Sequence, residues 1–199
     1  MQSIDSKLIS RIYGHGRGAV LTPNDFLDLG GRDAVDKALS RLATQGTIRR
    51  LARGLYEYPQ AHPELGTLSP DIQKIAKALA GKDRLRLQPA GAYATNLLGL
   101  SEQVPAKAVF LTDGPSRTVK IGKQEIQLRR TTPRNMAAAG RLAGLLMQAF
   151  RHLGREHITP QRITHLKRTL PAKERGLLLK DLSLTPAWMH SLFRDLAES

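Results

Sequence analysis

The stretch from Thr22 to Tyr58 constrains the fold more than any other part of this 199-residue chain. It opens with a helix-start signal, because Thr22 can cap a helix, Pro23 suits the first helical position and Asp25 completes a capping box. The sequence therefore predicts a short helix that ends at the tight turn Gly30-Gly31. Its apolar side would consist of Phe26, Leu27 and Leu29.

A second helix is predicted from about Arg32 to Gln45, with Gly46 as its C-cap. Apolar residues recur every three to four positions, so one face is expected to be buried. The residues expected inside are Ala34, Val35, Ala38, Leu39 and Leu42. The residues expected outside are Arg32, Asp33, Asp36, Lys37, Ser40, Arg41 and Thr44.

Two short β-prone runs follow, Thr47–Arg50 and Gly54–Tyr58, joined by Leu51-Ala52-Arg53. They predict a basic β-hairpin. A helix, a tight turn, a helix and a basic hairpin are typical of a winged helix-turn-helix, whose second helix reads the DNA major groove. The alternative is a protein-interaction module whose arginines only keep it soluble. The candidate DNA-binding residues are Arg32, Lys37, Ser40, Arg41 and Thr44 on the helix, with Arg49, Arg50 and Arg53 beside phosphates.

The segments on either side complete this unit. Ser3–Tyr13 has an apolar stripe and predicts a helix that completes a three-helix core, and Ala19–Leu21 predicts a short strand that pairs with the hairpin. The segment Pro59–Pro70 contains three internal or terminal proline breaks and a glycine, so the domain boundary is placed there. The predicted domains are residues 1–62, a winged helix-turn-helix, and residues 63–199.

The second domain is expected to be mixed α/β over residues 63–133 and helical over residues 134–199, so the whole chain is α+β. The long helix would run from Asn135 to about Leu153, and the last helix would bury Trp188, Met189, Leu192, Phe193 and Leu196. Before these helices, the expected elements are a helix at 71–80, strands at 85–87 and 108–112, a helix or turn at 89–98, and a hairpin at 117–121 and 125–130.

The net charge of +14 and a pI near 10.6 point to a polyanionic partner, with nucleic acid first and an anionic membrane surface second. The charge is spread along the chain. Residues 1–60 carry 9 basic and 6 acidic residues (+3), residues 61–133 carry 11 and 6 (+5), and residues 134–199 carry 11 and 5 (+6). Charge alone therefore does not locate the contact surface.

The chain has no cysteine, which excludes disulfides, zinc–cysteine fingers and thiol catalysis and fits a reducing cytosol. The N-terminus lacks the apolar region of a signal peptide, and the most apolar stretch, residues 136–150, is too short to span a bilayer. A cytoplasmic protein without a membrane partner is expected.

No enzyme signature is present, because the P-loop, G-x-S-x-G, H-E-x-x-H and kinase motifs are all missing. The six histidines have no metal-ligand spacing. A metal-dependent nuclease could use Asp113 and Glu125, but the position two after Glu125 is Gln127 instead of lysine. The prediction is a protein that is not an enzyme, with no cofactor and no metal.

The runs Val20–Pro59 (VLTPNDFLDLGGRDAVDKALSRLATQGTIRRLARGLYEYP) and Leu87–Thr131 (LQPAGAYATNLLGLSEQVPAKAVFLTDGPSRTVKIGKQEIQLRRT) resemble the AbiE-type antitoxins of type IV toxin–antitoxin and abortive-infection systems. The resemblance implies an N-terminal winged helix that binds and represses its own promoter. It also implies a C-terminal domain that counteracts a nucleotidyltransferase-type toxin without forming a stable complex with it.

In this chain the resemblance assigns the DNA contacts to residues 32–44 and 49–53. The expected oligomeric state is a monomer or a DNA-induced multimer. The alternative stays open that the chain is a basic winged-helix module that binds RNA or a protein partner and has no antitoxin activity.

Overall fold

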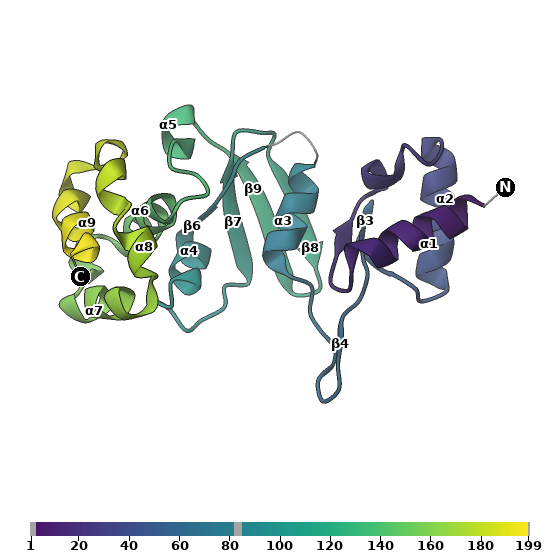
Figure 1. Ribbon diagram of the computed structural model, residues 1–199, viewed down its shortest axis with the longest axis horizontal. Helices are drawn as coiled ribbons and strands as arrows, with labels where there is room; N and C mark the ends of the chain where they lie inside the picture. The colour runs from purple at the N-terminus through teal and green to yellow at the C-terminus, as the bar shows by residue number, and fades with distance from the viewer. Residues whose placement is uncertain (1–2, 82–84, 199) are drawn as a thin grey trace. The chain divides into compact units, whose positions relative to one another are not determined.

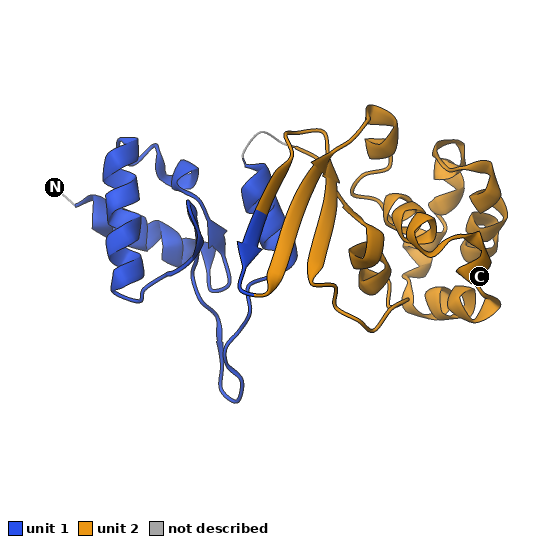
Figure 2. Ribbon diagram, turned by 180° about the vertical axis from the view of Figure 1, so that it is seen from behind, with its two compact units in different colours: residues 1–84, 119–122 blue, residues 85–118, 123–199 orange. Residues whose placement is uncertain are grey.

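The computed structural model describes residues 3–81 and 85–198 and shows an α+β protein, as the sequence predicts (Figure 1). The chain forms two compact units, which Figure 2 shows in different colours. Unit 1 consists of residues 1–84 and 119–122, and unit 2 consists of residues 85–118 and 123–199.

Unit 1 begins with helices around a small antiparallel sheet. The strand order is β1-β3-β2, so the predicted strand before the hairpin does pair with it, with Leu21 opposite Tyr56. The elements are α1 (Ile4–His15), β1 (Val20–Leu21), η1 (Pro23–Phe26), α2 (Arg32–Thr44), β2 (Arg49–Ala52) and β3 (Leu55–Glu57). The core residues are Leu8, Ile12, Leu21, Phe26, Val35, Ala38, Leu39, Leu42, Ile48 and Tyr56.

The predicted first helix of the central stretch is a single 3₁₀ turn, η1. The Asp25 carboxylate accepts hydrogen bonds from the Thr22 backbone N–H at 2.7 Å and the Thr22 hydroxyl at 3.0 Å, as a capping box requires. The element is short, so Leu27 lies beyond it and is 45% exposed, contrary to the prediction. Ala34 is also exposed, because the first turn of α2 extends past the core.

The hairpin forms as predicted, but its turn lies two residues later. Arg53 and Gly54 make a two-residue turn, because Ala52 pairs with Leu55 and Gly54 takes a φ of 68°. The register shifts between Arg50 and Ala52, so one extra residue is accommodated there. The turn thus places Arg53 at the tip of the hairpin.

The predicted boundary at residues 62 and 63 lies inside unit 1. The proline-rich segment contains a short antiparallel ribbon, β4 (Ala61–His62) and β5 (Gly66–Thr67), and α3 (Ile72–Ala80) follows it. Lys74 of α3 donates a hydrogen bond to the Gly18 carbonyl at 3.0 Å, so α3 is held against the start of the first sheet. Prolines mark the end of regular structure locally and carry no signal about such a distant contact.

Unit 2 has a four-stranded sheet in the order β6-β7-β9-β8. Strands β7 and β9 are parallel, and β6 pairs antiparallel with β7. Pro89 was predicted in a helix or turn but lies in β6, at the edge of the sheet, where its missing N–H costs no ladder bond. The elements are β6 (Leu87–Ala90), α4 (Gly91–Leu97), β7 (Lys107–Thr112), β8 (Arg117–Ile121) and β9 (Gln124–Arg130).

The predicted long helix is broken into α5 (Pro133–Met136) and α6 (Leu142–Leu153). Gly140 lies between them with a φ of 78°, a left-handed conformation that no helix contains. Asn135 therefore does not cap the long helix, and Arg141 occupies its N-cap position. Gly154 ends α6 with a φ of 84°, as predicted.

The C-terminal helices begin at the predicted proline signals. They are α7 (Pro160–Thr169), α8 (Ala172–Arg175), η3 (Leu178–Leu184), η4 (Ala187–Met189) and α9 (His190–Ala197), after the short turn η2 (Arg155–His157). Met189, Phe193 and Leu196 are fully buried against Phe150 and Leu146 of α6, so the aromatic stripe is core. No helix among the described residues is both long enough and apolar enough to cross a bilayer.

Candidate nucleic-acid interface

One face of α2 brings together four of the predicted DNA-binding residues. Lys37, Ser40, Arg41 and Thr44 are all exposed, and with Gln45 they line a shallow recess of about 360 Å³. The face exists because Val35, Ala38, Leu39 and Leu42 occupy the opposite side of the helix in the core. Polar donors thus stand in successive turns of a solvent-facing helix.

Arg32, the fifth predicted helix residue, lies at the start of α2 and is bound within the protein. Its Nε donates to the Asp36 carboxylate at 2.9 Å, and its Nη1 donates to the Asn24 side-chain oxygen at 3.1 Å. The structure therefore places Arg32 at the junction between η1 and the first turn of α2, outside the residues that line the recess.

Arg41 pairs with Asp5 of α1. Its Nε and Nη2 donate to the two carboxylate oxygens at 3.0 and 2.6 Å. These hydrogen bonds lower the pKa of Asp5 and raise the pKa of Arg41, against the smaller opposing effect of burial. Arg41 and Asp5 are accordingly both charged near neutral pH.

The α2 face is close to electrically neutral. Arg32 is balanced by Asp36, and Arg41 is balanced by Asp5. Lys37 and Asp33 also have opposite charges, and neither has a hydrogen-bond or ion-pair partner within residues 3–81 and 85–198. Attraction to phosphates would therefore have to come from elsewhere in unit 1.

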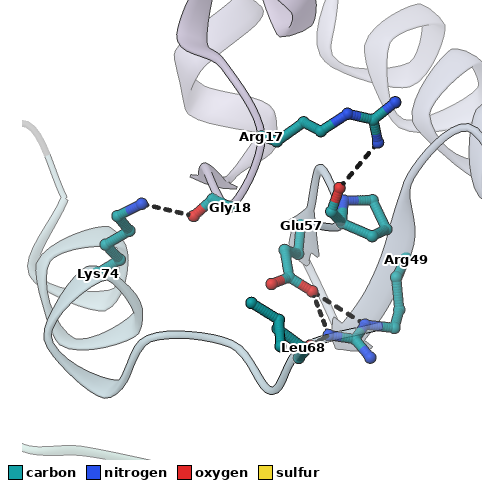
Figure 3. Close-up of polar contacts among 7 residues, drawn as sticks. Arg17, Gly18, Arg49, Glu57, Leu68 and Lys74 are labelled. Carbon is teal, nitrogen blue, oxygen red and sulfur yellow. Dashed lines mark hydrogen bonds and ion pairs between the residues drawn. The ribbon is translucent and has the colours of Figure 1, made fainter. Parts of the chain in front are cut away.

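The three hairpin arginines differ in their surroundings. Arg49 Nη2 lies 2.5 Å from a carboxylate oxygen of Glu57, directly opposite on β3, and also donates to the Leu68 carbonyl at 3.0 Å (Figure 3). The Glu57 side chain is only 2% exposed. Arg49 thus neutralises a buried carboxylate and ties the segment after β5 to the hairpin.

Arg50 and Arg53 are exposed on the same hairpin. The Arg50 guanidinium lies over the Tyr56 ring, 6.0 Å from its centroid, which leaves its N–H groups available. Arg53, at the turn, has no hydrogen-bond or ion-pair partner in the described parts of the chain. These two side chains are the hairpin charges that a polyanion could reach.

The base of the hairpin is held by further contacts to backbone carbonyls (Figure 3). Arg17 donates to the Pro59 carbonyl at 3.1 Å, and its guanidinium lies 4.9 Å from the centroid of the Tyr58 ring. Lys74 reaches the Gly18 carbonyl from α3. The hairpin therefore emerges from a base that several cationic side chains hold in place.

Two acidic residues shape this surface and were not among the predicted site residues. Glu57 could have been found from strand pairing, because it faces Arg49 in the hairpin register. Asp5 has no such signal, because 36 residues separate it from Arg41 and only the packing of α1 beside α2 brings them together.

In the described residues, no group of three or more histidine and acidic side chains could hold a metal ion. Residues 7–177 match the family described as "Family of unknown function (DUF6088)", and the chain belongs to that family. No curated protein matches the chain. The crystal structure of the RV2827C protein from Mycobacterium tuberculosis is similar over 98% of this chain and 82% of that chain, with 15% sequence identity and a TM-score of 0.48.

Proposed function

We propose that the first part of unit 1 is a winged helix-turn-helix that binds double-stranded DNA. The observation that carries this proposal is the exposed face of α2, where Lys37, Ser40, Arg41 and Thr44 line one recess. The element order α1-β1-η1-α2-β2-β3 and the sheet order β1-β3-β2 support it, because the β2–β3 hairpin then follows the second helix of the helix-turn-helix as a wing.

The roles divide by charge. The near-neutral α2 face suits contacts with base edges, which carry sequence information but little charge. Arg50 and Arg53 supply phosphate contacts from the wing, since they are exposed and lack a carboxylate partner. Arg49 keeps the wing folded through Glu57, and Arg32 fixes the start of α2.

The test compares two variants on two duplexes, the DNA upstream of the protein's own gene and a scrambled duplex of the same composition. Lys37→Ala should weaken binding to the upstream duplex more than to the scrambled one. Arg50→Ala with Arg53→Ala should weaken both alike and flatten the salt dependence by about 0.9 log units per lost contact. Equal losses from both variants on both duplexes would remove α2 from the recognition surface.

The alternative is a basic module that binds RNA or a protein, and the neutral α2 face is compatible with it. An A-form RNA duplex in the same titration separates the two, because its deep and narrow major groove excludes a helix. Tighter binding to the RNA duplex than to either DNA would favour the alternative.

We also propose, from the resemblance to AbiE-type antitoxins, that the full chain is a cytoplasmic antitoxin that counteracts a nucleotidyltransferase-type toxin without a stable complex. It would act as a monomer or a DNA-induced multimer. A full-length variant with Lys37, Arg50 and Arg53 replaced by alanine should lose promoter repression and still restore growth in cells that express a nucleotidyltransferase encoded beside its gene. Loss of rescue together with repression would mean that protection works through silencing of the toxin gene.

A further inference from the structure

The pair between Arg41 and Asp5 leaves one edge of the arginine open. A guanidinium carries five N–H groups in a rigid plane. Asp5 accepts from Nε at 3.0 Å and from Nη2 at 2.6 Å, so it occupies the side edge of that plane. The two Nη1 hydrogens and the second Nη2 hydrogen remain, and among them lies the outward pair that can bind guanine O6 and N7 together.

Other paired arginines of unit 1 do not keep that outward pair. Arg11 uses Nη1 and Nη2 for the two oxygens of Asp28, at 2.6 and 2.8 Å, so its outward edge is filled. Arg32 gives Nε to Asp36 but also gives Nη1 to Asn24. Each of these arginines already has an internal partner at the end of its side chain.

Arg49 differs from Arg41 in the same way. Its Nε and Nη2 both donate to Glu57, and Nη2 donates to the Leu68 carbonyl as well. Of the four arginines compared, Arg41 is the one whose carboxylate partner leaves the outward edge complete. Its side chain is 50% exposed and stands beside Lys37, Ser40 and Thr44 in the recess of α2.

We propose that Asp5 is a positioning residue that holds Arg41 in the orientation needed to read a guanine in the DNA major groove. This inference rests on the proposed DNA-binding function. A free arginine side chain samples many rotamers, and the two hydrogen bonds to Asp5 remove most of that freedom before DNA arrives. The carboxylate also cancels the charge of Arg41, which lowers its attraction to any phosphate. Asp5 therefore increases the preference for guanine while adding nothing to general affinity.

The experiment uses the full-length protein and a pool of DNA duplexes with a randomised centre. Wild-type protein first selects its preferred duplex from the pool. Affinities for that duplex, and for copies in which each guanine in turn is replaced together with its paired base, are then measured for wild type, Asp5→Asn, Arg41→Ala and the double variant. Asp28→Asn serves as the matched control, because it weakens an Arg–Asp pair that fills the outward edge instead.

Replacing one guanine should weaken wild-type binding about tenfold or more, as a bidentate arginine contact predicts. Asp5→Asn and Arg41→Ala should each remove most of that discrimination at the same position, and the double variant should lose no more than Arg41→Ala alone. On duplexes that lack the guanine, Asp5→Asn should bind at least as well as wild type. Asp28→Asn should keep the discrimination.

Several results would overturn the inference. They are a guanine preference that depends on Arg41 but survives Asp5→Asn, an equal loss on all duplexes, a gain on all duplexes, and an effect of Asp5→Asn that persists without Arg41. Arg41→Lys provides a second route if Asp5→Asn does not fold, since it keeps the charge and loses the paired donors. It should lose guanine discrimination with little change in the salt slope, and retained discrimination would contradict the inference. Wild-type protein that selects no duplex would defeat the proposed function itself.

Discussion

At the scale of single residues, the partner of each arginine decides what that arginine can do. Arg49 and Arg53 lie four positions apart in one hairpin, yet Arg49 faces a carboxylate that is 2% exposed and Arg53 stands at the turn. A buried carboxylate is stable only when it is paired and hydrogen-bonded. The same residue type is therefore structural at one position and available to a ligand at the other.

Arg49→Ala should lower the free energy of unfolding by roughly 2 kcal/mol, below the ~3–5 kcal/mol of a fully buried pair because Arg49 is itself 36% exposed. Arg53→Ala should change stability by no more than about 0.5 kcal/mol. Urea unfolding followed by circular dichroism measures both. Adding Glu57→Gln to Arg49→Ala should recover part of the loss, and a loss that stays complete would assign the effect to packing of the arginine side chain.

Asp5 should make stability depend on pH. The hydrogen bonds from Arg41 lower the folded-state pKa of Asp5, so its stabilising contribution is complete above the unfolded-state pKa of about 3.9 and is lost as pH falls through the lower folded value. The difference in urea midpoint between wild type and Asp5→Asn should thus be largest near neutral pH and shrink in acid. A difference that does not change with pH would mean that the ion pair adds no stability.

At the scale of elements, glycine conformation determines where helices end. Gly140 has a φ of 78° between α5 and α6, whereas Gly14 lies inside α1 with no positive φ. A Cβ at either position would meet no atom within 4 Å. Backbone strain and helix propensity are therefore the effects that an alanine would reveal at these two sites.

Gly140→Ala should destabilise the protein by about 1 kcal/mol, because a left-handed conformation is unfavourable for alanine. Gly14→Ala should stabilise it by roughly 0.5–1 kcal/mol, because alanine favours a helix interior. Thermal unfolding of both variants tests the pair. A stabilising Gly140→Ala would show that α5 and α6 can join as the continuous helix that the sequence pattern predicts.

Local signals in the sequence predict much of this fold. The capping box at Thr22, the strand at Val20–Leu21 and the buried stripe of α9 are all fixed by neighbours in the chain, and they form as predicted. The break at Gly140 escaped prediction, because one glycine is compatible with a helix pattern until its φ is known. The Asp5–Arg41 pair depends on tertiary packing, which periodicity does not describe.

At the scale of the whole molecule, each unit has its own hydrophobic core, one around Phe26 and Leu39 and the other around Phe150 and Phe193. Unit 1 extends past the proline-rich segment to include α3. The contacts that bind this extension are Lys74 to the Gly18 carbonyl and Arg49 to the Leu68 carbonyl. The smallest folding fragment should therefore contain α3.

A fragment of residues 1–81 should be more stable than a fragment of residues 1–62 by about 2 kcal/mol, since each hydrogen bond contributes about 1 kcal/mol and the packing of α3 adds to them. Urea unfolding of the two fragments gives the comparison. Equal midpoints would show that α3 contributes nothing to this unit, and the boundary would return to residues 62 and 63.

The central claim is that unit 1 reads DNA sequence through α2 and the wing. The most direct measurement is a fluorescence-anisotropy titration of the full-length protein at physiological salt, with the duplex upstream of its own gene and a scrambled duplex of equal length and composition. The account predicts that the upstream duplex binds about 10³-fold more tightly or better, as specific DNA-binding proteins do. Equal affinity for the two duplexes, or no binding to either, would contradict it.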